Sequence, residues 1–250
     1  MKVRMYNVGF GDCFCLRDRK KSLLVDFGTN NSRIEGRPRR EIFDVIISDL
    51  STIKSKNLLL THFHMDHLSG LLYMMKKKDI SVDFGKIYLP DVFSKKEMSR
   101  TLVLLLLADL LKESGLPSRQ VSLFALVDAL LENKQNVELL SRGKLFENKY
   151  QALWPDTDVI RKETDEVYNR ICEDGKFKEV MDVLLEFAEK LRLIVWSMTA
   201  EGNKPAETVE KETDLTASEL TEQPEVRQKI IRAYAVSYTH LRAHETAANL

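Results

Sequence analysis

The feature that most constrains the fold of this chain is a cluster of histidines and one aspartate directly after an apolar segment. Residues 57–61 read Asn-Leu-Leu-Leu-Thr, and residues 62–67 read His-Phe-His-Met-Asp-His. Residues i and i+2 of an extended segment point to the same side, so His62 and His64 can reach one metal ion. Asp66 suits the first turn of a following helix, where the helix dipole favours an acidic side chain. The spacing therefore predicts a strand-to-helix junction where four potential metal ligands converge: His62, His64, Asp66 and His67.

The donor types point to zinc, with manganese or iron as alternatives. The spacing His-x-His-x-Asp-His arises by chance in a chain of this length on the order of once in ten thousand. A structural zinc site is disfavoured, because such sites are usually closed and rich in cysteine. The nearby Cys13 and Cys15 alternate along an expected strand, which favours burial over ligation. The alternative is that the histidines are hydrogen-bonded residues at a strand end and that Asp66 is a helix cap.

The first 93 residues alternate between short strands and short helices, which is the signature of an α/β fold around a sheet. The apolar segment 57–60 is typical of a strand that is buried on both faces. Gly9, Gly11 and Asp12 interrupt the first two strands and are expected to form a structural turn. Strands are expected over residues 2–8, 13–17, 22–27, 57–60 and 86–89, and helices over residues 41–50 and 66–78.

From residue 94 onwards the pattern becomes mainly helical. We expect residues 94–200 to be a helical insertion that contains a pair of short strands near residues 137–154. Within it, helices are expected over residues 95–114, 118–133, 157–173 and 176–196, and strands over residues 137–140 and 150–154. Residues 201–235 are polar and predict a linker followed by a short helix over residues 228–235.

Residues 236–246 read Val-Ser-Tyr-Thr-His-Leu-Arg-Ala-His-Glu-Thr, which looks like the conceptual translation of a sequencing adaptor. On this interpretation residues 236–250 form a non-native tail, and the native frame continues elsewhere after Ala235. His240 and His244 have the i, i+4 spacing that one helix can use for a metal ion. They are not expected to be ligands, because the adaptor interpretation accounts for the whole run.

Charge and composition exclude several classes of protein. The chain has 38 basic and 38 acidic residues, so no field of the whole protein favours nucleic acid or anionic membrane. The longest apolar run, residues 102–108, is far shorter than the roughly 20 residues that span a bilayer. Three cysteines do not make a disulfide framework. These features predict a cytoplasmic protein without membrane insertion.

Residues 62–67 match the His-x-His-x-Asp-His signature of metallo-β-lactamase fold hydrolases. The runs Tyr-Asn-Val-Gly-Phe-Gly-Asp at 6–12 and Leu-Leu-Val-Asp-Phe-Gly at 23–28 precede it. This order resembles the ComEC/Rec2-like branch, whose soluble domain follows membrane-embedded DNA-uptake machinery. The resemblance covers residues 1–93. It implies an αββα sandwich, of which this chain would supply the N-terminal half with a large helical insertion.

The resemblance also implies a site for two metal ions, most simply Zn²⁺. The residues that match His62 and His64 bind the first ion, and those that match Asp66 and His67 bind the second. The residue that matches Asp26 does not bind the metal itself but orients the residues that do. Asp66 is in addition the expected catalytic residue, because it can orient the attacking water.

The sequence departs from this family in one important respect. The family needs a third histidine on the first metal, a bridging carboxylate and a later histidine, yet residues 68–235 contain no histidine. A chain that stops before its second half explains this and would be inactive as given. The prediction is a metal-dependent hydrolase of esters or phosphodiesters, with a small-molecule or nucleic-acid substrate. The alternative is a non-catalytic binding protein on a degenerate scaffold, with the helical insertion as its partner surface.

Overall fold

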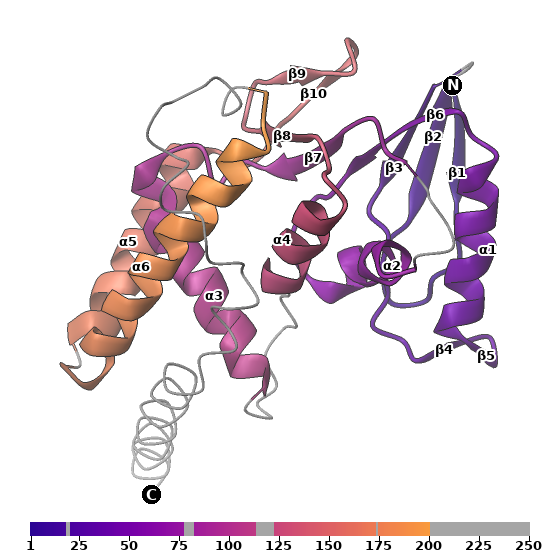
Figure 1. Ribbon diagram of the computed structural model, residues 1–250. Helices are drawn as coiled ribbons and strands as arrows, with labels where there is room; N and C mark the ends of the chain where they lie inside the picture. Colours follow the sequence, from indigo (N-terminus) through magenta and orange to yellow (C-terminus); the bar gives the residue numbers. More distant parts are fainter. Residues whose placement is uncertain (19–20, 78–82, 114–122, 174, 201–250) are drawn as a thin grey trace, which may run out of the picture.

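The computed structural model describes residues 1–18, 21–77, 83–113, 123–173 and 175–200. Its centre is a six-stranded mixed sheet with the order β1-β2-β3-β6-β7-β8 (Figure 1). This architecture of one sheet with helices confirms the predicted α/β class. The strands of this sheet are β1 (Lys2–Met5), β2 (Phe14–Asp18), β3 (Lys21–Val25), β6 (Ser55–Leu59), β7 (Ile87–Pro90) and β8 (Val137–Leu140).

The sheet combines an antiparallel part with a parallel part. Strands β1, β2 and β3 pair antiparallel, whereas β3, β6, β7 and β8 run parallel. The helix α1 (Arg39–Ser51) connects β3 to β6, and α2 (Met65–Met75) connects β6 to β7. Parallel strands place their carboxyl ends at one edge, where ligands of open α/β sheets usually bind. The segments after β3 and β6, which carry the predicted site residues, therefore share this edge.

The two faces of the sheet are covered unequally. Cys15, Leu24 and Leu58 are opposite one another on one face, fully buried in the core beneath the helices. On the other face, the exposed fraction is 60% for Val3 and 73% for Met5. The segment 57–60 was expected to be buried on both faces, and the structure corrects this. Leu59 is only half-buried, because the second face is covered incompletely by the described residues.

A small hairpin supplies part of the cover on this second face. It consists of β9 (Leu145–Phe146) and β10 (Tyr150–Gln151), and Phe146 packs with Leu23 and Tyr88 of the sheet. The sequence analysis placed a strand pair near residues 137–154 inside the helical insertion. The structure differs, because β8 hydrogen-bonds to β7 in the central sheet and β10 pairs with β9. The central sheet therefore extends beyond residue 93.

Three long helices form a separate layer beside the sheet (Figure 1). They are α3 (Ser99–Glu113), α5 (Thr157–Glu173) and α6 (Gly175–Ser197), and each packs against the other two. A short 3₁₀ helix, η1 (Lys96–Met98), precedes α3. The helix α4 (Leu123–Glu132) contacts both α2 and α3 and so joins this layer to the sheet. The described residues from 94 onwards are thus mainly helical.

Several expectations fall outside the described residues. They are the linker and helix of residues 201–235, the tail of residues 236–250 with His240 and His244, and the start of the helix expected from residue 118. A short hairpin of β4 (Arg33–Ile34) and β5 (Arg37–Pro38), which the sequence analysis did not predict, precedes α1. In the described part of the chain, no helix combines the length and the apolar character needed to cross a membrane.

Candidate metal centre

The site is built where β3 and β6 end side by side. Val25 pairs with Leu59 in the parallel register, so Asp26 emerges next to the segment that leads to His62. Asp26 adopts a left-handed backbone with φ of 54°, a conformation that aspartate tolerates better than most residues. His64 is the N-cap residue of α2. The strand end and the helix start therefore deliver the predicted residues to one edge of the sheet, as the sequence spacing indicated.

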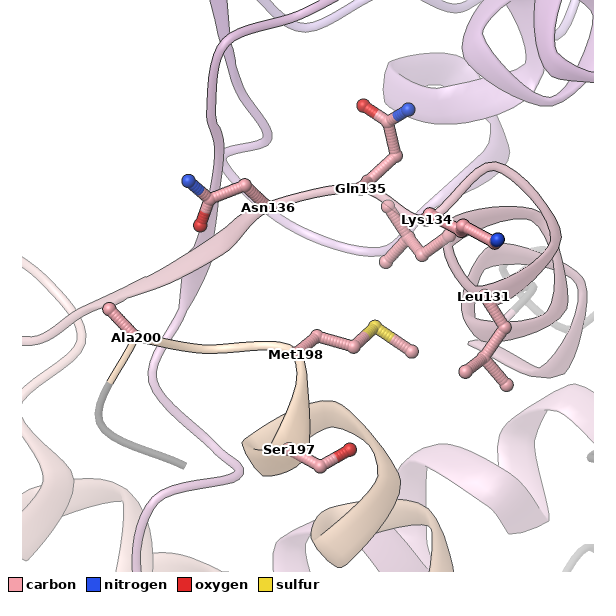
Figure 2. Close-up of a pocket in the computed structure, with 8 residues that line it drawn as sticks. Leu131, Lys134, Gln135, Asn136, Ser197, Met198 and Ala200 are labelled. Atoms are coloured by element: carbon pink, nitrogen blue, oxygen red, sulfur yellow. The ribbon is translucent and has the colours of Figure 1, made fainter. Parts of the chain in front are cut away.

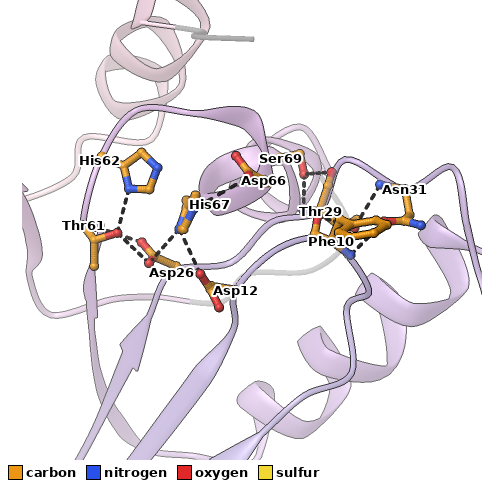
Figure 3. A network of polar contacts seen from close by, with 10 residues as sticks. All are labelled: Phe10, Asp12, Asp26, Thr29, Asn31, Thr61, His62, Asp66, His67 and Ser69. Carbon is orange, nitrogen blue, oxygen red and sulfur yellow. Dashed lines mark hydrogen bonds and ion pairs between the residues drawn. The ribbon is translucent and has the colours of Figure 1, made fainter. Parts of the chain in front are cut away.

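The carboxylate of Asp26 is the centre of the hydrogen-bond network (Figure 3). It is 2% exposed. Its Oδ1 accepts from the backbone N–H of Thr61 at 2.8 Å, and its Oδ2 accepts from the Thr61 hydroxyl at 2.7 Å. Oδ2 also lies 2.9 Å from Nδ1 of His67. One buried carboxylate thus connects the end of β6 to the first turn of α2.

This network sets which ring nitrogen of His62 and of His67 takes part in it. Nδ1 of His67 donates to Asp26, so the lone pair of that ring lies on Nε2. The Thr61 hydroxyl donates to Asp26 and accepts from Nδ1 of His62 at 3.0 Å, so the lone pair of His62 also lies on Nε2. A histidine that binds a metal typically donates its second ring N–H in this way to a carboxylate or another acceptor. In both rings, Nε2 is therefore the nitrogen that these hydrogen bonds leave unbonded.

Three of the four predicted ligands come together. One donor atom from each of His62, Asp66 and His67 lies within 4.8 Å of the others, and Nε2 of His67 is 3.8 Å from Oδ2 of Asp66. Two ligands of a tetrahedral zinc ion are about 3.4 Å apart, so small side-chain rotations complete the fit. His64 lies outside this group, although its ring centroid is 4.8 Å from that of His62. The donor set of imidazole and carboxylate suits a divalent cation.

The histidines have opposite pKa shifts. Burial opposes protonation of His67, but the hydrogen bond to Asp26 and the neighbouring carboxylates outweigh burial and raise the pKa above 6.5. Burial lowers the pKa of His62, and positive charge on His67 or His64 would lower it further. The neighbouring carboxylates thus favour the protonated form of His67, whereas burial and the neighbouring imidazoles favour the neutral form of His62.

A second group of donors was missed by the sequence analysis. Asp12, Asp26 and His67 also place donor atoms within 4.8 Å of one another, and Oδ2 of Asp12 lies 3.7 Å from Nδ1 of His67. The sequence analysis treated Asp12 as part of a structural turn and did not consider Thr61. The signal for Thr61 was its position directly before His62. No comparable spacing could identify Asp12, because residues 13–61 separate it from the cluster.

The turn of Gly9, Gly11 and Asp12 does lie beside the site. The backbone N–H of Asp12 donates to the carbonyl oxygen of Asp66, and that of Gly28 donates to the carbonyl oxygen of Asp12. A Cβ atom on Gly11 would come within 2.2 Å of the carbonyl oxygen of Gly28. Glycine is required there because three backbone segments approach too closely for a side chain.

Other candidate groups lie elsewhere. Cys13 and Cys15 are 1% and 0% exposed, and burial raises the pKa of the Cys13 thiol, so both are packed in the core. A hollow of about 410 Å³ lies between the end of α4 and the end of α6 (Figure 2). Its lining includes Lys134, Gln135 and Met198 but no histidine, cysteine or carboxylate. It offers none of the ligand chemistry of the cluster at His62.

Comparisons with known proteins agree with this geometry over part of the chain. Residues 6–91 match the family model of the Metallo-beta-lactamase superfamily. A stretch of 77 residues is 32% identical to the endoribonuclease YSH1 of Mycosarcoma maydis, covering 31% of this chain and 8% of that protein. The chain thus corresponds to a small part of that relative. No solved structure matches the chain significantly. By motif, sheet and family model, residues 6–91 resemble a domain of the Metallo-beta-lactamase superfamily.

Proposed function

We propose that this chain carries part of the active site of a metal-dependent hydrolase. His62, Asp66 and His67, with His64 beside them, hold the cation, and zinc is the favoured metal. The observation that supports this most strongly is that Asp26 fixes His67, and through Thr61 also His62, with Nε2 directed away from the hydrogen-bond network. A purely structural pair of histidines does not require both rings to present the same nitrogen.

A divalent cation bound here supplies a water of lowered pKa and polarises the scissile bond. The residues of the chain perform the remaining tasks. Asp66 binds the cation and orients the attacking water, and His67 stays in place through its bond to Asp26. The name of the relative, an endoribonuclease, favours a phosphodiester as the scissile bond. The resemblance to the ComEC/Rec2-like branch supports the same class.

The donors of the cluster are too few for two complete metal sites. Zinc takes three protein ligands in most catalytic sites, and within the described residues histidine occurs only at positions 62, 64 and 67. We therefore propose that the 250-residue chain binds zinc weakly and does not turn over substrate. Turnover then depends on ligands that these residues do not provide.

The test is isothermal titration of the full chain with Zn²⁺, together with an assay on bis-p-nitrophenyl phosphate. We expect weak zinc binding without turnover, and a loss of at least tenfold in affinity for His67→Ala and Asp66→Ala. The double variant His240→Ala/His244→Ala is the matched histidine control and should bind as the unmodified chain does. Zinc binding that survives His67→Ala contradicts the metal centre. Tight binding of two zinc ions with turnover contradicts the incompleteness of the site.

A further inference from the structure

Phe10 holds a large apolar ring in solvent next to the candidate metal centre. Its exposed fraction is 80%. The backbone of Phe10 is held by two hydrogen bonds: its N–H donates to Oδ1 of Asn31 at 2.8 Å (Figure 3), and its carbonyl oxygen accepts from the N–H of Asn30 at 2.8 Å. Two residues later, Asp12 lies beside His67. A hydrogen-bonded loop thus presents an uncovered aromatic ring two residues away from Asp12, which lies at the site.

A run of arginines belongs to the same surface region. Arg33, Arg37, Arg39 and Arg40 fall within eight residues and all are exposed. In the part of the chain that the structure describes, none of them forms an ion pair with an acidic side chain. The carboxylate of Glu35, within the same run, is instead hydrogen-bonded to Asn7. The zero net charge of the whole chain therefore conceals a local basic segment, defined here as residues 33–40.

The positions of two arginines are not explained by helix stability. Arg39 and Arg40 occupy the first turn of α1. The amino-terminal end of a helix carries partial positive charge, so cations there are unfavourable, whereas the acidic Glu41 in the same turn is favourable. Arg39 and Arg40 therefore lower the stability of the ligand-free protein, and a bound anion would offset this loss.

Hydrogen bonds join the basic segment to the loop of Phe10. The side chain of Asn7 donates to Oε1 of Glu35 at 2.7 Å. Gly9 approaches Asn31 so closely that a Cβ atom would lie 3.0 Å from Oδ1. Figure 1 shows the β4–β5 hairpin next to the lower end of α1 in this view. The ring, the basic segment and the metal centre are therefore held together through a few short loops.

We propose that Phe10 and the basic segment bind a single-stranded nucleic acid and guide it to the metal centre. A base stacks on the ring of Phe10, and phosphates contact the arginines. The ligand is single-stranded rather than duplex nucleic acid, because a base can stack on an aromatic side chain only when it is not stacked within a duplex. This inference rests on the proposed function, since it names the substrate class of the same centre.

The experiment measures fluorescence anisotropy of labelled dT12 and rU12 oligonucleotides with the full chain in EDTA. The chelator removes metal, so that binding is measured without cleavage. We expect binding that weakens as salt rises, and a loss of about fivefold or more for Phe10→Ala and Phe10→Leu, because leucine lacks a π-face. Arg37→Gln/Arg40→Gln should weaken binding and reduce the salt dependence by about 1.4 in the slope of log K against log salt.

Matched controls separate this surface from the rest of the molecule. Leu153→Ala removes an apolar side chain that is 79% exposed. Arg161→Gln/Lys162→Gln removes two exposed cations from α5. Both should bind the oligonucleotides as the unmodified chain does. A preference for dT12 or for rU12 assigns the strand to DNA or RNA and supports the proposal either way.

Two results overturn the proposal. One is no binding of either oligonucleotide at low salt. The other is binding that the Phe10 variants leave unchanged, which would indicate a general attraction of polyanions. Titration of the same protein preparations with Zn²⁺, in buffer without EDTA, keeps the two proposals separate. Intact zinc binding without oligonucleotide binding contradicts this inference alone, whereas absent zinc binding contradicts the proposed function.

Discussion

At the scale of single residues, the site depends on Asp26 as an acceptor for three donor groups of two residues, Thr61 and His67. The left-handed backbone of Asp26 brings its carboxylate under Thr61 and His67. Such a conformation is uncommon for a residue other than glycine and persists only where the surroundings determine it. The hydrogen bonds to Asp26 and its burial are those surroundings.

Thr61 is predicted to orient His62 through its hydroxyl group. Thr61→Val keeps the shape of the side chain but removes both hydrogen bonds, so His62 can rotate or present the wrong nitrogen. We expect zinc affinity to fall roughly tenfold to a hundredfold, with little change in the melting temperature. Thr61→Ser restores the hydroxyl and should restore the affinity. Equal zinc affinity of the valine and serine variants would contradict this role.

The ionisation of His67 in the metal-free protein is a second prediction at this scale. Its pKa lies above 6.5 in the folded chain, so protonation of His67 stabilises the metal-free fold below pH 6.5. That contribution is lost as the pH rises through the folded pKa. NMR titration should place His67 above 6.5 and His62 below it, and Asp26→Asn should lower the pKa of His67. A pKa of His67 that Asp26→Asn leaves unchanged contradicts the pairing.

At the scale of elements, the sheet edge is held by backbone contacts among three segments. The loop before β2, the segment after β3 and the start of α2 hydrogen-bond to one another through Asp12, Phe27 and Asp66. These contacts leave no room for side chains at Gly11 and Gly28. The geometry of the site therefore depends on the packing of loops that are distant in sequence.

Gly11→Ala is expected to destabilise this packing. The added Cβ would lie 2.2 Å from a backbone oxygen, which cannot move without displacing the segment after β3. We expect a loss on the order of 2–4 kcal/mol in the free energy of unfolding, together with weaker zinc binding. Gly175→Ala is the control, because nothing lies within 4 Å of its Cβ position. Urea denaturation measures the free energy of unfolding of both variants. A Gly11→Ala variant as stable as the control would contradict the close approach.

Much of the element order could be predicted from the sequence because it depends on local patterns. The helix over residues 157–173 and the hairpin of β2 and β3 follow from spacing and turn residues. The partner of β8 could not be predicted, because pairing across the helices α3 and α4 is a long-range contact. The same limit applies to Asp12, whose approach to His67 depends on the folding of the whole sheet edge.

At the scale of the whole molecule, the helices α3, α5 and α6 form a layer beside the sheet, and their buried side chains belong to the same hydrophobic core as those of the sheet. Leu102, Leu184 and Leu191 are at most 1% exposed within that layer. No residue of these three helices belongs to the donor groups at the sheet edge. The layer therefore contributes to stability, and its effect on the metal centre is expected to be small.

Leu191→Ala tests this division of roles. Removing a fully buried leucine should cost about 2–5 kcal/mol of stability, while zinc affinity stays within twofold of the original at temperatures where the chain is folded. Val167→Ala, at a position 47% exposed on α5, is the matched control and should change stability by less than about 0.5 kcal/mol. Thermal unfolding measures the stability of both variants, and titration with zinc measures their zinc affinity. A tenfold change in zinc affinity for Leu191→Ala would show that the helical layer shapes the site.

The central claim is that imidazole and carboxylate groups at the junction of β6 and α2 bind a divalent cation. X-ray absorption at the zinc edge of the zinc-loaded chain tests it most directly. We predict nitrogen and oxygen ligands at about 2.0–2.1 Å with the scattering pattern of imidazole, and loss of that pattern in His62→Ala/His67→Ala. Sulfur ligands at about 2.3 Å, or an unchanged spectrum in that double variant, would contradict the claim.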